Sequence, residues 1–229
     1  MPTAVLVDGS SFLKRYRAVF PDPGAYTAQQ VARNLFTWAI RHLEEDERDR
    51  REPYRIFFYD CPPFEKKAHN PITGQAIDFS KTPEADFRRE LHAELKKTRK
   101  LALRLGRLAE HSAWALRPGV TKKLLAREIA LEALCEGDVV YDLRQKGVDM
   151  RIGLDIASLA FKRQVDQIVL FAGDADFVPA AKLARREGID FVLDPMWQSI
   201  PPDLHEHIDG LRSTCPRPRP RTQGTGAEP

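Results

Sequence analysis

The chain has few cysteines and no long apolar run, and both absences narrow its class. Only three of its 229 residues are cysteines, Cys61, Cys135 and Cys215, and no two of them form a CxxC pair. This pattern argues against a disulfide framework and a cysteine zinc site, and it fits a reducing cytosol. No apolar run approaches the roughly 20 residues needed to span a bilayer, and the first residues carry no basic segment typical of a secretory signal. We therefore expect a cytoplasmic protein with no membrane partner.

Positive charge is unevenly distributed along the chain. The net charge is only +3, but residues 81–127 contain thirteen lysines and arginines and five acidic residues, a local charge of +8. A basic segment of this kind favours a polyanionic partner such as a nucleic acid. The alternative is that these side chains form a solvated helix face with no partner.

Apolar runs that alternate with amphipathic segments predict an α/β fold with a central, mainly parallel sheet. We expect one domain over residues 1–212, with a helical basic insertion at about 62–137, followed by a disordered Pro- and Arg-rich tail over 213–229. The insertion is predicted to contain a long helix over 84–105 and a second helix over 121–135. The expected strands of the domain are 4–7, 54–59, 168–172 and 189–193.

Acidic residues follow the expected strands or begin the expected helices. Asp8 ends the first strand, Asp149 begins a helix, and Asp174 and Asp176 lie in the turn after the strand 168–172. The carboxyl ends of parallel strands meet at one edge of a sheet, so we expect these acids to lie together, with Asp155 facing the same cleft. The alternative for each acid is a structural role, as a helix cap or turn former, or for Asp155 as an ion-pair partner.

Several carboxylates in one pocket need a compensating cation. Oxygen ligands with few histidines or cysteines suit Mg²⁺ or Mn²⁺, which can activate water and bind phosphate. Beside a basic segment, such a site indicates phosphodiester hydrolysis. Asp60 also ends a strand, but we interpret it as a turn residue before Pro62. The side chains expected to contact nucleic acid are Ser11, Lys146, Arg88, Lys96, Arg99 and Lys100.

Three segments resemble the NYN domain, in the LabA-like bacterial branch of the PIN-like nuclease superfamily. They are Val5-Leu6-Val7-Asp8-Gly9, Lys146-Gly147-Val148-Asp149 together with Asp155, and Gly173-Asp174-Ala175-Asp176-Phe177. The resemblance implies a PIN-like three-layer α/β/α fold, a divalent metal ion and ribonuclease activity.

The resemblance also implies roles for individual residues. The family's acidic positions correspond to Asp8, Asp149 and Asp174 as catalytic residues and metal ligands, with Asp176 and Asp155 as supporting metal ligands. One position departs from the family pattern, because Ser11 stands where the family often has Asn, and Ser offers only a shorter hydroxyl.

Two hypotheses for function follow. The first is a metal-dependent endoribonuclease that acts on single-stranded RNA and leaves 5′-phosphate and 3′-hydroxyl ends, with DNA and homo-oligomer formation left open. The second is a non-catalytic RNA-binding or regulatory interaction module on the same fold, which Ser11 slightly favours. A small-molecule phosphatase is weaker, because Asp8-Gly9-Ser10 lacks the DxD pattern that such enzymes place after the first strand.

Overall fold

A six-stranded parallel sheet forms the centre of the computed structural model, which describes residues 2–22, 24, 26–44, 51–109 and 113–218. Every neighbouring pair in this sheet is parallel. The carboxyl ends of the strands therefore share one edge, called the carboxyl edge below. In spatial order the strands are β12 (Gly210–Leu211), β11 (Asp190–Asp194), β10 (Gln167–Phe171), β1 (Pro2–Asp8), β2 (Glu52–Asp60) and β5 (Leu101–Leu105).

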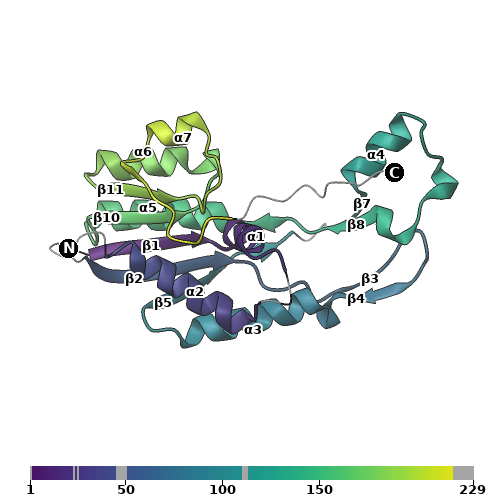
Figure 1. Ribbon diagram of the computed structural model, residues 1–229, viewed down its shortest axis with the longest axis horizontal. Coiled ribbons are helices and arrows are strands. Elements are labelled where there is room, and N and C mark those ends of the chain that lie inside the picture. The colour runs from purple at the N-terminus through teal and green to yellow at the C-terminus, as the bar shows by residue number, and fades with distance from the viewer. Residues whose placement is uncertain (1, 23, 25, 45–50, 110–112, 219–229) are drawn as a thin grey trace, which may run out of the picture.

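Helices cover both faces of the sheet, which confirms the predicted three-layer α/β/α arrangement (Figure 1). One face carries α1 (Gly9–Val19), α2 (Ala28–Arg41) and α3 (Pro83–Lys97). The other face carries α5 (Val148–Phe161), α6 (Val178–Arg186) and the short α7 (Pro202–Glu206). In the described part of the chain, no helix combines the length and apolarity that crossing a bilayer requires.

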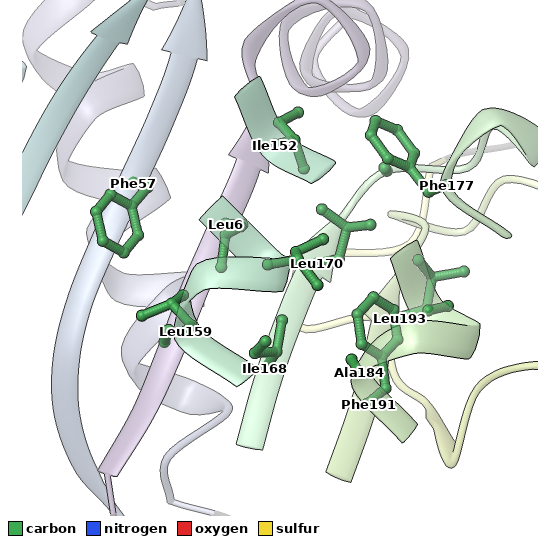
Figure 2. Packing of buried hydrophobic residues seen from close by; sticks show 14 of the residues in the cluster. Leu6, Phe57, Ile152, Leu159, Ile168, Leu170, Phe177, Ala184, Phe191 and Leu193 are labelled. Atoms are coloured by element: carbon green, nitrogen blue, oxygen red, sulfur yellow. The ribbon is translucent and has the colours of Figure 1, made fainter. Parts of the chain in front are cut away.

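The central strands are apolar through their middle positions because both faces of the sheet are buried. In β1, Leu6 packs towards α5 and α6, whereas Val5 and Val7 pack towards α1 and α2, and none of the three is more than 1% exposed. Figure 2 shows Leu6 and Leu170 from neighbouring strands with Ile152 of α5. Burying each such side chain contributes roughly 1.5–3 kcal/mol, so the position of the carboxyl edge rests on a firm core.

An arm projects from the core on the side of the carboxyl edge (Figure 1). It consists of three antiparallel strand pairs and one helix. These elements are β3 (Lys67–His69) with β4 (Ala76–Asp78), β6 (Arg107–Leu108) with β9 (Gln145–Lys146), β7 (Ala113–Leu116) with β8 (Val139–Asp142), and α4 (Pro118–Leu125). The arm is held to the sheet near β5 and α5, so it lies next to the ends of the central strands.

The segment predicted as a helical insertion contributes directly to the core. The predicted helix over 84–105 is wrong after Lys97, where α3 ends, because Leu101–Leu105 forms β5, the edge strand of the main sheet. Between them Lys100 adopts a left-handed backbone conformation with φ 64°, which turns the chain. The predicted helix over 121–135 is also too long, since α4 ends at Leu125.

The start of the C-terminal tail also differs from the expectation. Thr214 and Cys215 are buried, although the tail was predicted to begin at residue 213. The Thr214 backbone N–H and hydroxyl both donate to the Asp194 carboxylate, at 3.1 and 3.0 Å, and His42 lies 2.9 Å from the same oxygen. The chain is therefore held against the core through residue 215. The predicted disorder of residues 219–229 lies outside the described residues.

Candidate functional site

Asp8 is held rigidly at the junction of β1 and α1. It is 9% exposed, and one carboxylate oxygen, Oδ1, accepts the backbone N–H groups of Ser10 at 3.0 Å and Ser11 at 3.3 Å. This is an N-cap for α1. The next residue must be glycine, because a Cβ at Gly9 would lie 2.5 Å from the Tyr59 carbonyl oxygen. The local fold thus fixes Oδ1 and leaves Oδ2 without a hydrogen bond from these groups.

The Asp8 carboxylate lies in an environment that disfavours its charge. Burial raises the pKa of Asp8 to about 6, against the opposing effect of the backbone hydrogen bonds from Ser11 and Ser10. The negative charges of Asp149 and Asp60 raise this pKa further. Asp8 is therefore close to two other acids, and a nearby cation would stabilise its charged form.

Asp149, Asp174 and Asp176 lie together beside Asp8. Asp149 is in the first turn of α5, which begins after Gly147 at a left-handed φ of 77°. Burial raises the pKa of Asp149, and the charges of Asp176 and Asp174 raise it further. One oxygen of Asp174, Oδ1, accepts the backbone N–H of Asp176 at 3.2 Å. The structure therefore brings four of the five predicted acids to the carboxyl edge.

The carboxylate oxygens of these four acids are the type of ligand that a hard divalent cation prefers. None of the ion pairs found among the described residues involves any of the four, so their charges are not compensated by a side chain there. Within the same residues, no three carboxylate, histidine or cysteine side chains already converge as ligands of one ion. A fully preformed cage is not required for Mg²⁺, which usually keeps several waters and binds one or two carboxylates. The arrangement therefore suits a hydrated ion.

Asp155 does not join this group. It accepts the Tyr59 hydroxyl at 2.7 Å, and Arg104 Nε lies 3.4 Å from the same oxygen. Burial and this hydrogen bond raise the pKa of Tyr59. Asp155 lies six residues after Asp149 on α5, about 240° around the helix axis, so its carboxylate meets Tyr59 and Arg104 near the ends of β2 and β5 and not the other acids. Its contacts favour a role in fixing α5 on β2.

Asp60 is a buried charge at the end of β2 and not the turn residue that we expected. It is 0% exposed and is bound by Arg88, by His92 at 2.8 Å and more weakly by Gln145 at 3.4 Å. Burial alone would raise the pKa of Asp60, but the hydrogen bond from His92 and the charge of Arg88 lower it. The spacing of Arg88 and His92 places both on one face of α3, but nothing in the sequence shows that this face meets Asp60.

The predicted nucleic-acid contacts divide into two groups. Arg88 is committed to the buried Asp60, with its side chain 17% exposed. Lys96, Arg99 and Lys100 are exposed, but Lys96 lies in the last turn of α3, and Arg99 and Lys100 precede β5 at its amino end. The Lys100 carbonyl accepts the N–H of Ile56, which is four residues and about 13 Å before the end of β2. These three basic residues are remote from the acids because the segment after α3 is a strand and not more helix.

Other polar residues do surround the acids. A cavity of 360 Å³ at the carboxyl edge is lined by Asp8, Ser10, Ser11, Lys14, Asp174 and Gln198, among others. Lys14 was not among the predicted site residues, although its position one turn after Ser11 on α1 was a usable signal. Gln198, which comes from the loop after β11 and has no motif around it, was also not among them. Lys146 is exposed and lies three residues before Asp149.

Residues 119–204 match the model of the NYN domain family. The matched segment runs from α4 to α7 and contains Asp149, Asp174 and Asp176. Asp8 lies outside the matched segment but is brought beside it by the parallel pairing of β1 with β10. No curated protein matches the chain. The LabA-like branch stays a prediction.

Proposed function

We propose that this chain, in which residues 119–204 match the NYN domain family of the PIN-like nuclease superfamily, is a metal-dependent endoribonuclease acting on single-stranded RNA. One observation carries the proposal. Asp8, Asp149, Asp174 and Asp176 gather at the carboxyl edge, where Asp8 and Asp149 have raised pKa values and the described residues supply no paired cation. Acids held together in this way destabilise the folded state, and such a cost is typical of functional sites.

The residues present suggest how such a site would be held. Asp8, Asp149 and Asp174 would hold the ion, Mg²⁺ or Mn²⁺, directly or through its bound waters, with Asp176 nearby. When bound, the ion would supply a water of lowered pKa and neutralise phosphate charge. Asp8 and Asp174 each use Oδ1 for a backbone N–H, so each can present its other oxygen without loss of the local fold. Ser11 keeps its backbone contact with Asp8, which preserves the geometry of the position.

Cleavage of a labelled single-stranded RNA tests this proposal. We expect cleavage only with Mg²⁺ or Mn²⁺, inhibition by a chelator, and 5′-phosphate ends. Asp149→Asn should reduce the rate at least about a hundredfold, because it removes a charged ligand worth several kcal/mol. The matched control is Asp142→Asn in the arm, where the acid forms a surface pair with Arg144.

Two outcomes would contradict the proposal in different ways. RNA binding that weakens steeply with salt, without turnover under either ion, would support the non-catalytic RNA-binding module. Divalent-dependent cleavage that is unchanged in Asp149→Asn would retain the activity but reject the site.

Lys14 is expected to contact the phosphate backbone, because it is exposed and lines the cavity with Asp8 and Asp174. Lys14→Gln should weaken RNA binding and reduce the slope of log K against log salt by about 1. Lys96→Gln removes an equally exposed charge in the last turn of α3 and should leave the slope unchanged. The measurement is fluorescence anisotropy across a salt series, and equal effects of the two substitutions would reject the assignment.

A further inference from the structure

A second cavity adjoins the acid site. It has a volume of 470 Å³ and is lined by Ser10, Phe64, Phe79, Leu108, Leu143 and Gln145, among others. Ser10 lines this cavity and also the cavity that contains Asp8 and Asp174. The two cavities are therefore neighbours, and a chain that places a phosphate in one can place an adjacent group in the other.

The aromatic part of this cavity is fixed by packing within the arm. The ring centroids of Phe64 and Phe79 are 5.1 Å apart, and each ring also contacts Tyr141, at 5.1 and 5.2 Å. Tyr141 in turn packs edge-on against Trp114 at 5.3 Å. Phe64 and Phe79 nevertheless remain partly exposed. Rings that are already held in place lose little conformational entropy when a flat ligand stacks on them.

Polar groups on the cavity wall are also held in place. Gln145 and Arg88 are bonded to the buried Asp60, and Arg88 Nε donates to Glu84 at 3.1 Å. The Thr82 hydroxyl donates to the Phe79 carbonyl at 2.8 Å. The cavity thus combines aromatic faces with fixed donors and acceptors, which is the chemistry that recognises a nucleobase.

We propose that this cavity binds one unpaired nucleobase of the strand whose phosphate lies at the acids. The identity of the ligand rests on the proposed function, which supplies an RNA strand to the neighbouring cavity. A base paired in a duplex cannot leave its stack without an energetic penalty, so this cavity selects single-stranded RNA.

The test combines a protein substitution with a change in the RNA. All binding is measured by anisotropy in the Asp149→Asn background, with a labelled oligoadenylate of about ten nucleotides at about 50 mM salt. Phe64→Leu removes the aromatic face but keeps an apolar side chain, and it should weaken binding about tenfold to a hundredfold. The control is Phe161→Ala, which removes an exposed ring at the far end of α5. Thermal melting shows whether each variant folds.

Oligonucleotides with one abasic nucleotide, moved along the strand, then locate the contact. At one position the abasic nucleotide should weaken binding of the parent protein about as much as Phe64→Leu does. In the Phe64→Leu protein, the same abasic nucleotide should cause no further loss of binding. Additive effects at every position, a lack of RNA binding, or equal effects of Phe64→Leu and Phe161→Ala would overturn the proposal. If the effects are non-additive at one position but the unsubstituted chain cleaves no RNA, the base-binding cavity is supported and the nuclease activity is rejected.

Discussion

Asp8→Asn will abolish cleavage and at the same time stabilise the metal-free protein at neutral pH. Asparagine has nearly the same shape, and its side-chain oxygen can still accept the N–H groups of Ser10 and Ser11 that cap α1. The substitution removes only the charge. We expect the rate to fall at least about a hundredfold, because a charged metal ligand is lost.

The pH dependence gives the sign of the stability change. The pKa of Asp8 rises from 3.8 to about 6 on folding, so the folded state binds a proton more tightly than the unfolded state. Stability from this group is fully present below the unfolded pKa of 3.8 and is lost as the pH rises through about 6. The shift corresponds to roughly 3 kcal/mol at pH 7. In Asp8→Asn, this loss of folding stability between pH 4 and 7 should be absent.

Urea denaturation with a chelator, at pH 5 and pH 7, measures this difference. The variant should be more stable than the unsubstituted protein at pH 7, and the difference should be smaller at pH 5. Added Mg²⁺ should stabilise the unsubstituted protein at pH 7 and the variant much less. An Asp8→Asn protein that cleaves RNA normally would reject Asp8 as a ligand.

Asp155→Asn is the matched comparison for this experiment. It removes a carboxylate from the same neighbourhood, but one that is occupied by Tyr59 and Arg104. We expect cleavage to be retained, and stability to fall by about 1.5–3 kcal/mol because a hydrogen bond to a charged group is weakened. If both variants are folded and both lose cleavage, Asp155 would be supported as a metal ligand.

Features with a local cause were predictable from the sequence. The strands β1, β10 and β11 are buried on both faces, so they read as short continuous apolar runs. Each is followed by an acid or a glycine turn, and parallel pairing alone places those acids at one edge. This is why Asp8, Asp174 and Asp176 could be predicted to lie together, although Asp8 and Asp174 are far apart in the chain. Asp149 follows no strand of the sheet and was predicted from its place at the start of a helix.

Features that depend on distant partners were not predictable. Leu101 and Leu103 of β5 pack on one face of the sheet and Ala102 on the other, but this two-residue period is short and continues the helical spacing of α3. Because residues 101–105 form a strand, Arg99 and Lys100 precede β5 at its amino end, away from the acids. No pattern along the chain shows that Asp60 is buried, since its partners Arg88 and His92 are known only once α3 is placed.

Arg88→Met will cause the largest loss of stability among the charged substitutions considered. Asp60 is 0% exposed, and the substitution removes its only full positive charge among the described contacts, leaving His92 and the longer contact with Gln145. Breaking a buried pair by removing one partner costs about 3–5 kcal/mol, because the remaining charge is uncompensated. The measurement is urea denaturation at pH 7.

The pH profile and two further variants separate this structural role from a role in RNA binding. Because the pKa of Asp60 is lowered in the folded state, its contribution is present at neutral pH and is lost as the pH falls below its usual range, so Arg88→Met should flatten the acid side of the stability profile. Asp60→Asn combined with Arg88→Met should recover much of the loss, since no charge remains to be paired. Arg89→Met is the control, because Arg89 is the next residue on α3 and its ion pairs with Glu65 and Asp86 lie at the surface. Arg89 also donates to the Ser80 carbonyl at 2.6 Å, so a small loss of stability is expected, well below that of Arg88→Met. If Arg88→Met is as stable as Arg89→Met but binds RNA more weakly, Arg88 belongs to the nucleic-acid surface after all.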